Sequence, residues 1–352
     1  METFNESTKN PSGAAVAAKP VRWWRRPAGI ILIVFLSFFF LFFAAGIAAI
    51  TALIQSAGQG IAAAEELREE RISGSGKTKV VMISISGVIL ERVRTPFFEG
   101  AVTADRVIEQ LQMAGRAADV AAVLMRVDSP GGSVTASDRI HREVEKLRAK
   151  KKVVVLMGDT AASGGYYVSV AAHKIFAHPT SVTGSIGVIV NSINVHDLIK
   201  QFGVQSVTIK SSEYKDLLSP FKSPAELEAD KAVYRQIVMK LYDRFVMLVS
   251  RGRGIPLDKA RALADGRIYD AQSALSNGLI DEIGYQDDVL SWLKKKLGKD
   301  RFTLIEYTRP LGIFSRLFLE SAQSKAPRVS FSDALGWLEL GSRPMYLWLP
   351  GI

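Results

Sequence analysis

The chain has 352 residues, of which 48% are apolar and 23% charged, a balance that supports a packed core and excludes a disordered or collagen-like protein. It contains no cysteine, which excludes disulfide frameworks, cysteine-ligated zinc, iron–sulfur clusters and thiol nucleophiles. The formal net charge is +10, but the positive residues are spread along the chain. This distribution favours an ordinary solvated surface over nucleic-acid binding.

An uncharged, mostly apolar segment of 27 residues occupies positions 28–54. About 20 apolar residues suffice to cross the core of a bilayer, so this segment predicts a transmembrane anchor. A cleaved signal peptide is the alternative, but its apolar region is usually shorter and follows a shorter preface. Arg22, Arg25 and Arg26 precede the segment, and positive residues stay on the cytoplasmic side. We therefore expect residues 1–27 inside and the chain after about residue 55 outside.

A polar stalk or linker is expected over residues 55–78. Residues 65–71 are charged and favour continuation of a helix out of the membrane, whereas residues 73–76 (Ser-Gly-Ser-Gly) predict a flexible break. This stalk separates the anchor from the remainder of the chain.

Strands and helices alternate in the part that follows. Short apolar runs rich in β-branched residues predict strands at 79–85, 120–127 and 153–157, and helical spacing predicts helices at 104–118 and 135–150. Further strands are expected at 186–190 and 204–209 around a helix near 194–202, and longer helices near 224–252 and 256–265. Such alternation is typical of a mostly parallel sheet covered by helices. We expect one α/β domain over 79–300 and a C-terminal extension over 301–352.

Two loops after predicted strands contain glycines that suit a catalytic site. Residues 128–133 (Asp-Ser-Pro-Gly-Gly-Ser) leave backbone N–H groups free to face an anion, although a tight turn capped by Ser133 is the plainer alternative. Residues 159–165 resemble the strand-to-helix turn that exposes a nucleophilic serine, with Ala161 in place of the first glycine. Ser163 is the candidate nucleophile, and a helix N-cap is its alternative role.

A serine nucleophile needs a base, and no histidine lies in a loop with an acidic partner. His141, His173, His178 and His196 are more typical of surface or packing positions, and no H-E-x-x-H pattern predicts zinc. A lysine can replace histidine when burial lowers its pKa. Lys215 lies in a polar loop that fits this role, although composition alone does not choose it over Lys174 or Lys210.

Five segments in order resemble signal peptide peptidase A, the bacterial membrane-anchored Ser/Lys peptidases of the S49 type, related to the Clp protease and crotonase folds. They are residues 128–132, 161–167, 183–188, 214–216 and 264–269. The resemblance covers about residues 79–295 and implies the short form with one catalytic domain. It thus implies a Clp protease/crotonase-like mixed sheet with flanking helices, preceded by one transmembrane helix.

The resemblance also implies roles for individual residues. Ser163 matches the nucleophile, Lys215 the general base and Ser185 the hydroxyl that holds the lysine amine. The backbone N–H groups of Gly164 and of the Gly131–Gly132 turn match the oxyanion hole, with the contributing glycine of that turn left open. Phe97 and Phe98 are candidates to line the substrate groove or to lie in the core.

The implied protein is a serine endopeptidase at the outer face of the bacterial cytoplasmic membrane. Its expected partners are remnant signal peptides, other short hydrophobic peptides, membrane lipid and further copies of itself that share active sites. No cofactor, metal or nucleic acid is expected. A catalytically silent membrane scaffold is the alternative, and a crotonase-like acyl-CoA enzyme is disfavoured by the outward topology.

The C-terminal tail is apolar and lies outside the resemblance. Residues 345–352 (Met-Tyr-Leu-Trp-Leu-Pro-Gly-Ile) are costly to leave in water, so we expect them to dock on a surface. The substrate groove, a subunit contact and the membrane surface are the alternatives that the sequence leaves open.

Overall fold

The computed structural model describes Phe35 and residues 67–92, 101–309 and 344–347. The chain divides into two compact units, with the second beginning at Glu66, and the fold below is that of the second unit. Several predicted features lie outside the described residues. They are residues 1–27, the predicted anchor 28–54 except Phe35, and the candidate groove residues Phe97 and Phe98. Within those described ranges, no helix combines the length and apolar character that a bilayer crossing requires.

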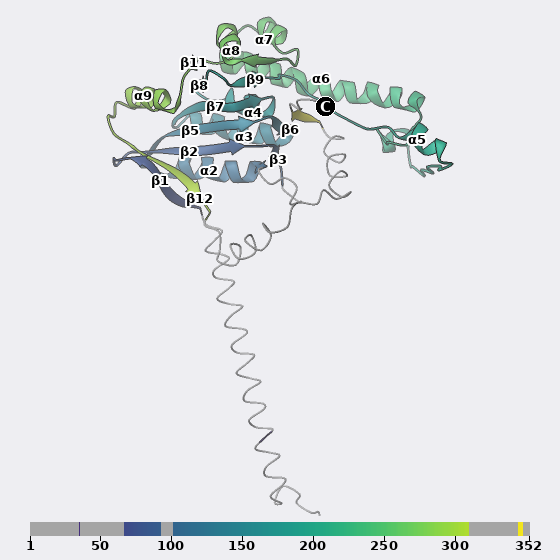
Figure 1. Cartoon of the computed structure of the whole chain (residues 1–352), viewed down its shortest axis with the longest axis horizontal. Coiled ribbons are helices and arrows are strands. Elements are labelled where there is room, and N and C mark those ends of the chain that lie inside the picture. Colours follow the sequence, from purple (N-terminus) through teal and green to yellow (C-terminus); the bar gives the residue numbers. More distant parts are fainter. Residues whose placement is uncertain (1–34, 36–66, 93–100, 310–343, 348–352) are drawn as a thin grey trace, which may run out of the picture. The chain divides into compact units, whose positions relative to one another are not determined.

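The described elements form a large sheet, a small sheet and flanking helices (Figure 1). The large sheet consists of β1 (Arg68–Gly74), β2 (Lys79–Ser86), β5 (Val120–Ser129), β7 (Lys152–Ala162), β8 (Lys174–Ala177), β9 (Val182–Gly184), β10 (Ile268–Asp270), β11 (Glu282–Ile283) and β12 (Thr303–Thr308). The small sheet consists of β3 (Ile89–Leu90), β4 (Val102–Thr103), β6 (Gly131–Ser133) and β13 (Met345–Leu347). The helices are α2 (Ala104–Arg116), α3 (Val134–Arg148), α4 (Gly164–Ser169), α5 (His196–Gln201), the 3₁₀ turn η3 (Glu213–Asp216), α6 (Pro224–Arg253), α7 (Leu257–Leu263), α8 (Ala271–Asn277) and α9 (Gln286–Leu297).

The large sheet is mostly parallel. Its main order is β1-β12-β2-β5-β7-β8-β11, and only the β1–β12 and β9–β10 pairs are antiparallel. The long strand β7 changes neighbours along its length, because its first half pairs with β8 and its last three residues pair with β9. The carboxyl ends of β7 and β9 therefore lie side by side, which is where sites form in such sheets.

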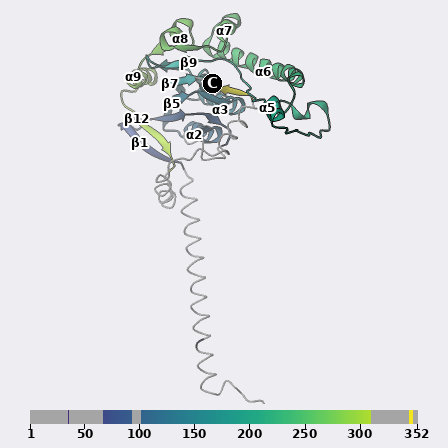
Figure 2. The same cartoon turned by 45° about the vertical axis from the view of Figure 1, so that its right-hand side comes forward.

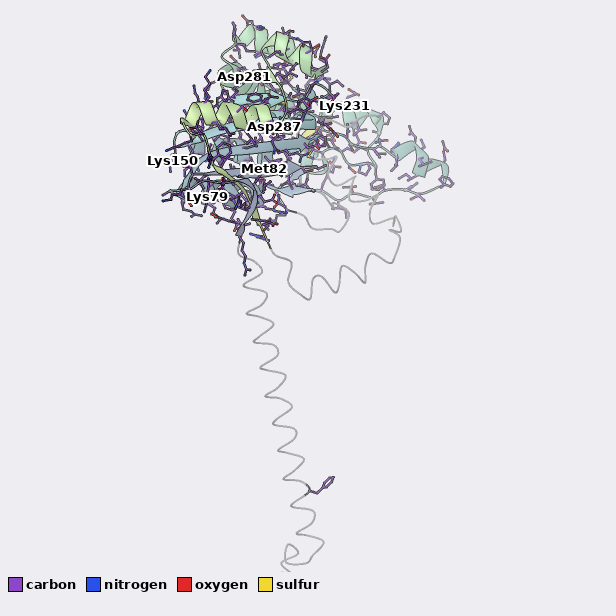
Figure 3. The ribbon with its side chains drawn as sticks, turned by 60° about the vertical axis from the view of Figure 1, so that its left-hand side comes forward. Lys79, Met82, Lys150, Lys231, Asp281 and Asp287 are labelled. Carbon is purple, nitrogen blue, oxygen red and sulfur yellow. The ribbon has the colours of Figure 1, made fainter. Side chains whose placement is uncertain are left out.

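Alternating side chains of the central strands enter two apolar layers. In β2, Val81, Ile83 and Ile85 face the larger core, which includes residues of α2, α3 and α4. Val80, which points to the opposite face, packs in a second cluster with Val289 and Leu293 of α9. Figure 3 labels Met82 of β2 and Asp287 of α9 on this second side. Helices on both faces explain why the strands read as nearly continuous apolar runs.

The structure corrects three local expectations. Residues 68–74 of the predicted stalk form β1, which pairs with β12, since pairing at the sheet edge satisfies backbone groups that local helix preference does not. Residues 186–190 and 204–209 are not strands. Val207 and Ile209 are 83% and 96% exposed, so the second run has the composition of a strand without a partner to pair with.

An extended segment, residues 187–223, leaves the large sheet after β9 and leads into the start of α6. We call it the arm. It contains α5 and η3, and Figures 1 and 2 show α5 beside the end of α6 that lies away from the sheet. Helix α6 begins in a capping box between Ser223 and Glu226 with Pro224 at its first position, and ends at Gly254 in the left-handed conformation.

Candidate active site

Ser163 occupies a strained turn between β7 and α4. Its backbone has φ 52° and ψ −112°, a region that residues with a side chain rarely adopt. The Ser163 N–H donates to the Gly184 carbonyl at 2.8 Å, and the Ser163 carbonyl accepts from the Tyr167 N–H at 2.8 Å. The side chain does not cap α4, so the alternative role as an N-cap is wrong. The turn is thus held by backbone contacts, and its buried side chain makes no capping hydrogen bond with α4.

Ser185 lies beside Ser163 at the end of the neighbouring strand. Ala162 of β7 pairs with Gly184 of β9, so the two serines are the next residues along adjacent parallel strands. Ser185 also has a positive φ, 47°, and its N–H donates to the Arg267 carbonyl at 2.8 Å. The tertiary structure therefore brings these two candidates together.

The three candidate oxyanion glycines also meet at this place. A Cβ on Gly131 would lie 2.6 Å from the Gly164 nitrogen, and a Cβ on Gly164 would lie 3.0 Å from the Gly132 nitrogen. Only glycine permits this approach of β6 to the first turn of α4. The Gly131 N–H donates to the Ser129 hydroxyl at 3.1 Å. Gly132 and Gly164 are consequently the better candidates as donors to a substrate oxygen.

Part of the C-terminal tail lies along the glycine strand. Met345–Leu347 forms β13, which pairs antiparallel with β6 and places Tyr346 opposite Gly132. Tyr346 is fully buried and stacks on Tyr167 with ring centroids 4.7 Å apart. Residues 345–347 therefore dock at the candidate site, and this edge of β6 accepts an extended apolar segment.

Lys215 is not brought to Ser163 within one chain. It lies in η3, where its side chain is exposed. The contacts around η3 reach Asp230 near the start of α6, whereas Phe245 farther along α6 packs on Tyr167. Fifteen residues of helix separate Asp230 from Phe245, a length of about 22 Å. A lysine side chain of one protomer does not bridge that separation.

The histidines occupy packing or surface positions. His141 is buried in α3 and packs edge-on against Tyr167 at 5.3 Å, and burial lowers its pKa. The His173 ring accepts a hydrogen bond from the Val153 N–H. No histidine of the described chain forms a hydrogen bond with Ser163, which agrees with the expectation from the sequence.

Two charged residues of the arm and α6 were not found by sequence reasoning. Lys222 is 7% exposed and Asp230 is 1% exposed, and the lysine amine contacts both carboxylate oxygens of Asp230, at 2.9 and 2.7 Å. Their separation by eight positions across a helix cap is no recognised motif. Only tertiary burial distinguishes them from other charged residues of the region.

Comparison with known proteins places this geometry in context. The family model "Peptidase family S49" matches residues 145–300, and the model "Clp protease" matches residues 92–183. Ser163 lies inside both matched ranges. The fold is thus a Clp protease-like α/β fold with a mixed sheet and flanking helices.

Individual relatives agree with the family models. A putative signal peptide peptidase SppA from Enterococcus faecium is 38% identical over 80% of this chain and 85% of the relative. The putative protease slr0021 from Synechocystis is 32% identical over 78% of this chain and 97% of the relative. Among solved structures, a mutant of ClpP1 from Listeria monocytogenes has a TM-score of 0.40 at 18% identity, over 59% of this chain and 94% of that chain.

Proposed function

Because the chain belongs to peptidase family S49, the serine peptidases of the signal peptide peptidase A type, we propose that it is a membrane-anchored endopeptidase using Ser163 and Lys215. Its proposed substrates are remnant signal peptides and other short hydrophobic peptides. The observation that carries the proposal is the Ser163 turn, whose strained backbone presents an uncapped hydroxyl beside Gly132 and Gly164.

The proposed reaction is acyl transfer through a serine ester. The neutral amine of Lys215 takes the Ser163 proton while Oγ attacks the peptide carbonyl, and the N–H groups of Gly132 and Gly164 stabilise the oxyanion. The lysine ammonium then gives its proton to the departing amine as the peptide bond breaks. Water repeats these steps on the acyl-enzyme, which releases the acid and restores Ser163.

The lysine is proposed to come from a neighbouring protomer. A lysine acts as a base only when its amine is neutral, which burial away from water favours. Lys215 is exposed in its own chain, so its burial requires another copy. The arm also exposes large apolar side chains, among them Phe202, Val207 and Ile209, which supports a contact with a second copy. In that contact the Ser185 hydroxyl, next to Ser163, is proposed to hold the incoming amine.

The proposed substrate binds as an extended strand along β6. The pairing of β13 with this strand supports the idea, because β13 is an apolar segment held in that conformation. The proposed anchor, residues 28–54, would keep the peptidase at the outer face of the cytoplasmic membrane, where its hydrophobic substrates are released. Membrane lipid is then a partner of the anchor.

The test compares the full chain in detergent with three single variants, using hydrolysis of a hydrophobic peptide. Ser163→Ala and Lys215→Ala are expected to be inactive, whereas Lys200→Ala, an exposed lysine of the arm, keeps wild-type activity. Mixed oligomers of Ser163→Ala and Lys215→Ala should recover activity, because one intact serine meets one intact lysine across the contact.

The outcomes separate the parts of the proposal. Full activity of Lys215→Ala contradicts the proposed base, and lack of recovery in mixed oligomers contradicts the shared site. A folded, oligomeric wild type that cleaves no peptide and does not react with a serine-directed probe favours the catalytically silent scaffold.

A further inference from the structure

The arm and the first two thirds of α6 bury charged residues and no apolar ones. Between residues 187 and 244, Lys222 and Asp230 are the two residues that are buried. The Lys222 amine contacts Asp230 at 2.7 Å and Asp216 at 2.9 Å. Desolvation opposes the charged form of Lys222, but the hydrogen bonds that the amine donates to Asp230 and Asp216 outweigh it and raise the pKa of the amine. We call Asp216, Lys222 and Asp230 the clasp.

The clasp holds the turn that carries Lys215. Asp216 directly follows Lys215 in η3, and its Oδ1 contacts the amines of both Lys222 and Lys210 at 2.9 Å. Asp230 Oδ2, the oxygen 2.7 Å from the Lys222 amine, also accepts a hydrogen bond from the Leu218 N–H at 2.8 Å. One side chain of α6 thereby fixes the backbone on the C-terminal side of Lys215.

Leu218 is itself strained. The described residues include three non-glycine positions with positive φ, which are Ser163, Ser185 and Leu218. Leu218 has φ 57°, and the Ser192 hydroxyl donates to its carbonyl at 3.1 Å. A left-handed leucine is unfavourable by about 1–2 kcal/mol and persists only where its surroundings impose it. The strain therefore indicates that the loop has one required conformation.

A buried ion pair is a poor source of stability compared with an apolar contact. The loss of solvation offsets most of the attraction between the charges, so its directional contacts are its distinctive property. In the arm those contacts determine the path of the chain around Lys215. An apolar pair of similar size would bury area without setting that path.

We propose that Asp230 is a positioning residue for Lys215, acting through Lys222 and Asp216 to present the lysine amine to Ser163 of a neighbouring protomer. The inference rests on the proposed function, because it takes Lys215 as the base. Asp230 itself touches neither the substrate nor the reacting atoms.

The test is Asp230→Asn in the full chain in detergent, with Glu228→Gln as the matched control. Glu228 lies on the same helix and forms an exposed pair with Lys231, which is labelled in Figure 3, so its loss should leave kcat unchanged. Asp230→Asn should lower kcat about tenfold to a hundredfold with little change in KM, since it misplaces a reacting group. The rise of kcat/KM with pH should also move to higher pH. A misplaced Lys215 amine is less well buried away from water, so it holds its proton up to a higher pH in the proposed site.

Mixed oligomers provide a readout that general loss of structure does not give. Asp230→Asn combined with Ser163→Ala should regain activity, because the intact arm of the second chain serves the intact serine of the first. Asp230→Asn combined with Lys215→Ala should not, because neither chain has a competent arm. Recovery of activity in the second mixture overturns the inference. So does a lack of recovery in the first mixture, if Ser163→Ala and Lys215→Ala complement each other.

The remaining outcomes are also decisive. If Asp230→Asn keeps the wild-type kcat while Lys215→Ala is inactive, the positioning role of Asp230 is wrong but Lys215 can still be the base. If Lys215→Ala is active, both the proposed base and the positioning role are wrong. If Asp230→Asn does not fold, Leu218→Gly tests the same inference. Glycine relieves the strain at this position, so this variant should fold with an unchanged or higher thermal midpoint. A severalfold lower kcat in Leu218→Gly supports the inference, and an unchanged kcat overturns it.

Discussion

The region around Ser163 and the arm around Lys215 are built in opposite ways. Ser163 lies where buried strands meet, and Ala161, Ala162 and Tyr166 near it are fully buried. The arm buries no apolar side chain, and the clasp takes the place of a core. The difference places the proposed nucleophile in the buried interior of the chain and the proposed base on an exposed surface, which the proposal completes with a second protomer.

The same contrast appears at the glycines. Gly132 in the site is crowded by the backbone of β3, since a Cβ on it would lie 1.9 Å from the Ile89 carbonyl oxygen. Gly203 in the arm has nothing within 4 Å of such a Cβ. Crowding at the first glycine and open space at the second give a direct way to probe the two regions.

The largest effect is expected from Gly132→Ala. The new methyl group must displace β6 from Ile89 of β3, so a proposed oxyanion donor is misplaced and kcat should fall at least about a hundredfold. Gly203→Ala has φ 70° at its site and should cost about 1 kcal/mol of stability without loss of kcat. Peptide hydrolysis and thermal unfolding of both variants check this, and equal losses of kcat would contradict the contrast.

A smaller effect of opposite sign is expected when residues 340–352 are deleted. This deletion removes β13 and frees the edge of β6 for substrate. If β13 leaves the edge of β6 free about one tenth of the time in the full chain, its removal should raise kcat/KM about tenfold. Deletion of residues 348–352 is the control, because it leaves Met345–Leu347 in place. Unchanged kcat/KM and thermal midpoint after the longer deletion would refute docking of the tail at the site.

The smallest effect concerns the pH dependence of stability. Burial lowers the pKa of His141, so between that value and its ordinary value near 6.5 the unfolded chain binds more protons than the folded one. Stability is therefore complete above about pH 6.5 and is lost as the pH falls through this window. The thermal midpoint of the wild type should fall more than that of His141→Gln between pH 7.5 and 5.5. An equal fall in both proteins would assign the pH sensitivity elsewhere.

The arm should contribute little to that pH dependence. Hydrogen bonds from Lys222 and Lys210 lower the pKa of Asp216, and the pKa of Lys222 is raised, so both groups stay ionised over the same range. We therefore expect the pH dependence of stability, like the effect of the glycine substitutions on kcat, to be larger for the region around Ser163 than for the arm.

Several features of the fold were accessible from local pattern. The strands at 79–85, 120–127 and 153–157 match β2, β5 and β7, and the helix predicted at 224–252 matches α6. Each has a strong apolar period or a clear cap, which act over a few residues. The runs 186–190 and 204–209 have the same composition, but a strand also needs a partner, and local pattern does not supply one.

The amino-acid sequence by itself determined the order of the main elements, the glycine-rich turns after two strands and Ser163 as a candidate nucleophile, whereas Lys215 was chosen among several lysines only through the family resemblance. Only the tertiary structure decided that Ser163 and Ser185 end neighbouring strands, that Tyr346 lies opposite Gly132, and that Lys222 and Asp230 are buried together. Local pattern reports the preferences of residues close in the chain, whereas these contacts join segments whose distance is set by packing. The separation of Lys215 from Ser163 is of the same kind, because the length of α6 sets it.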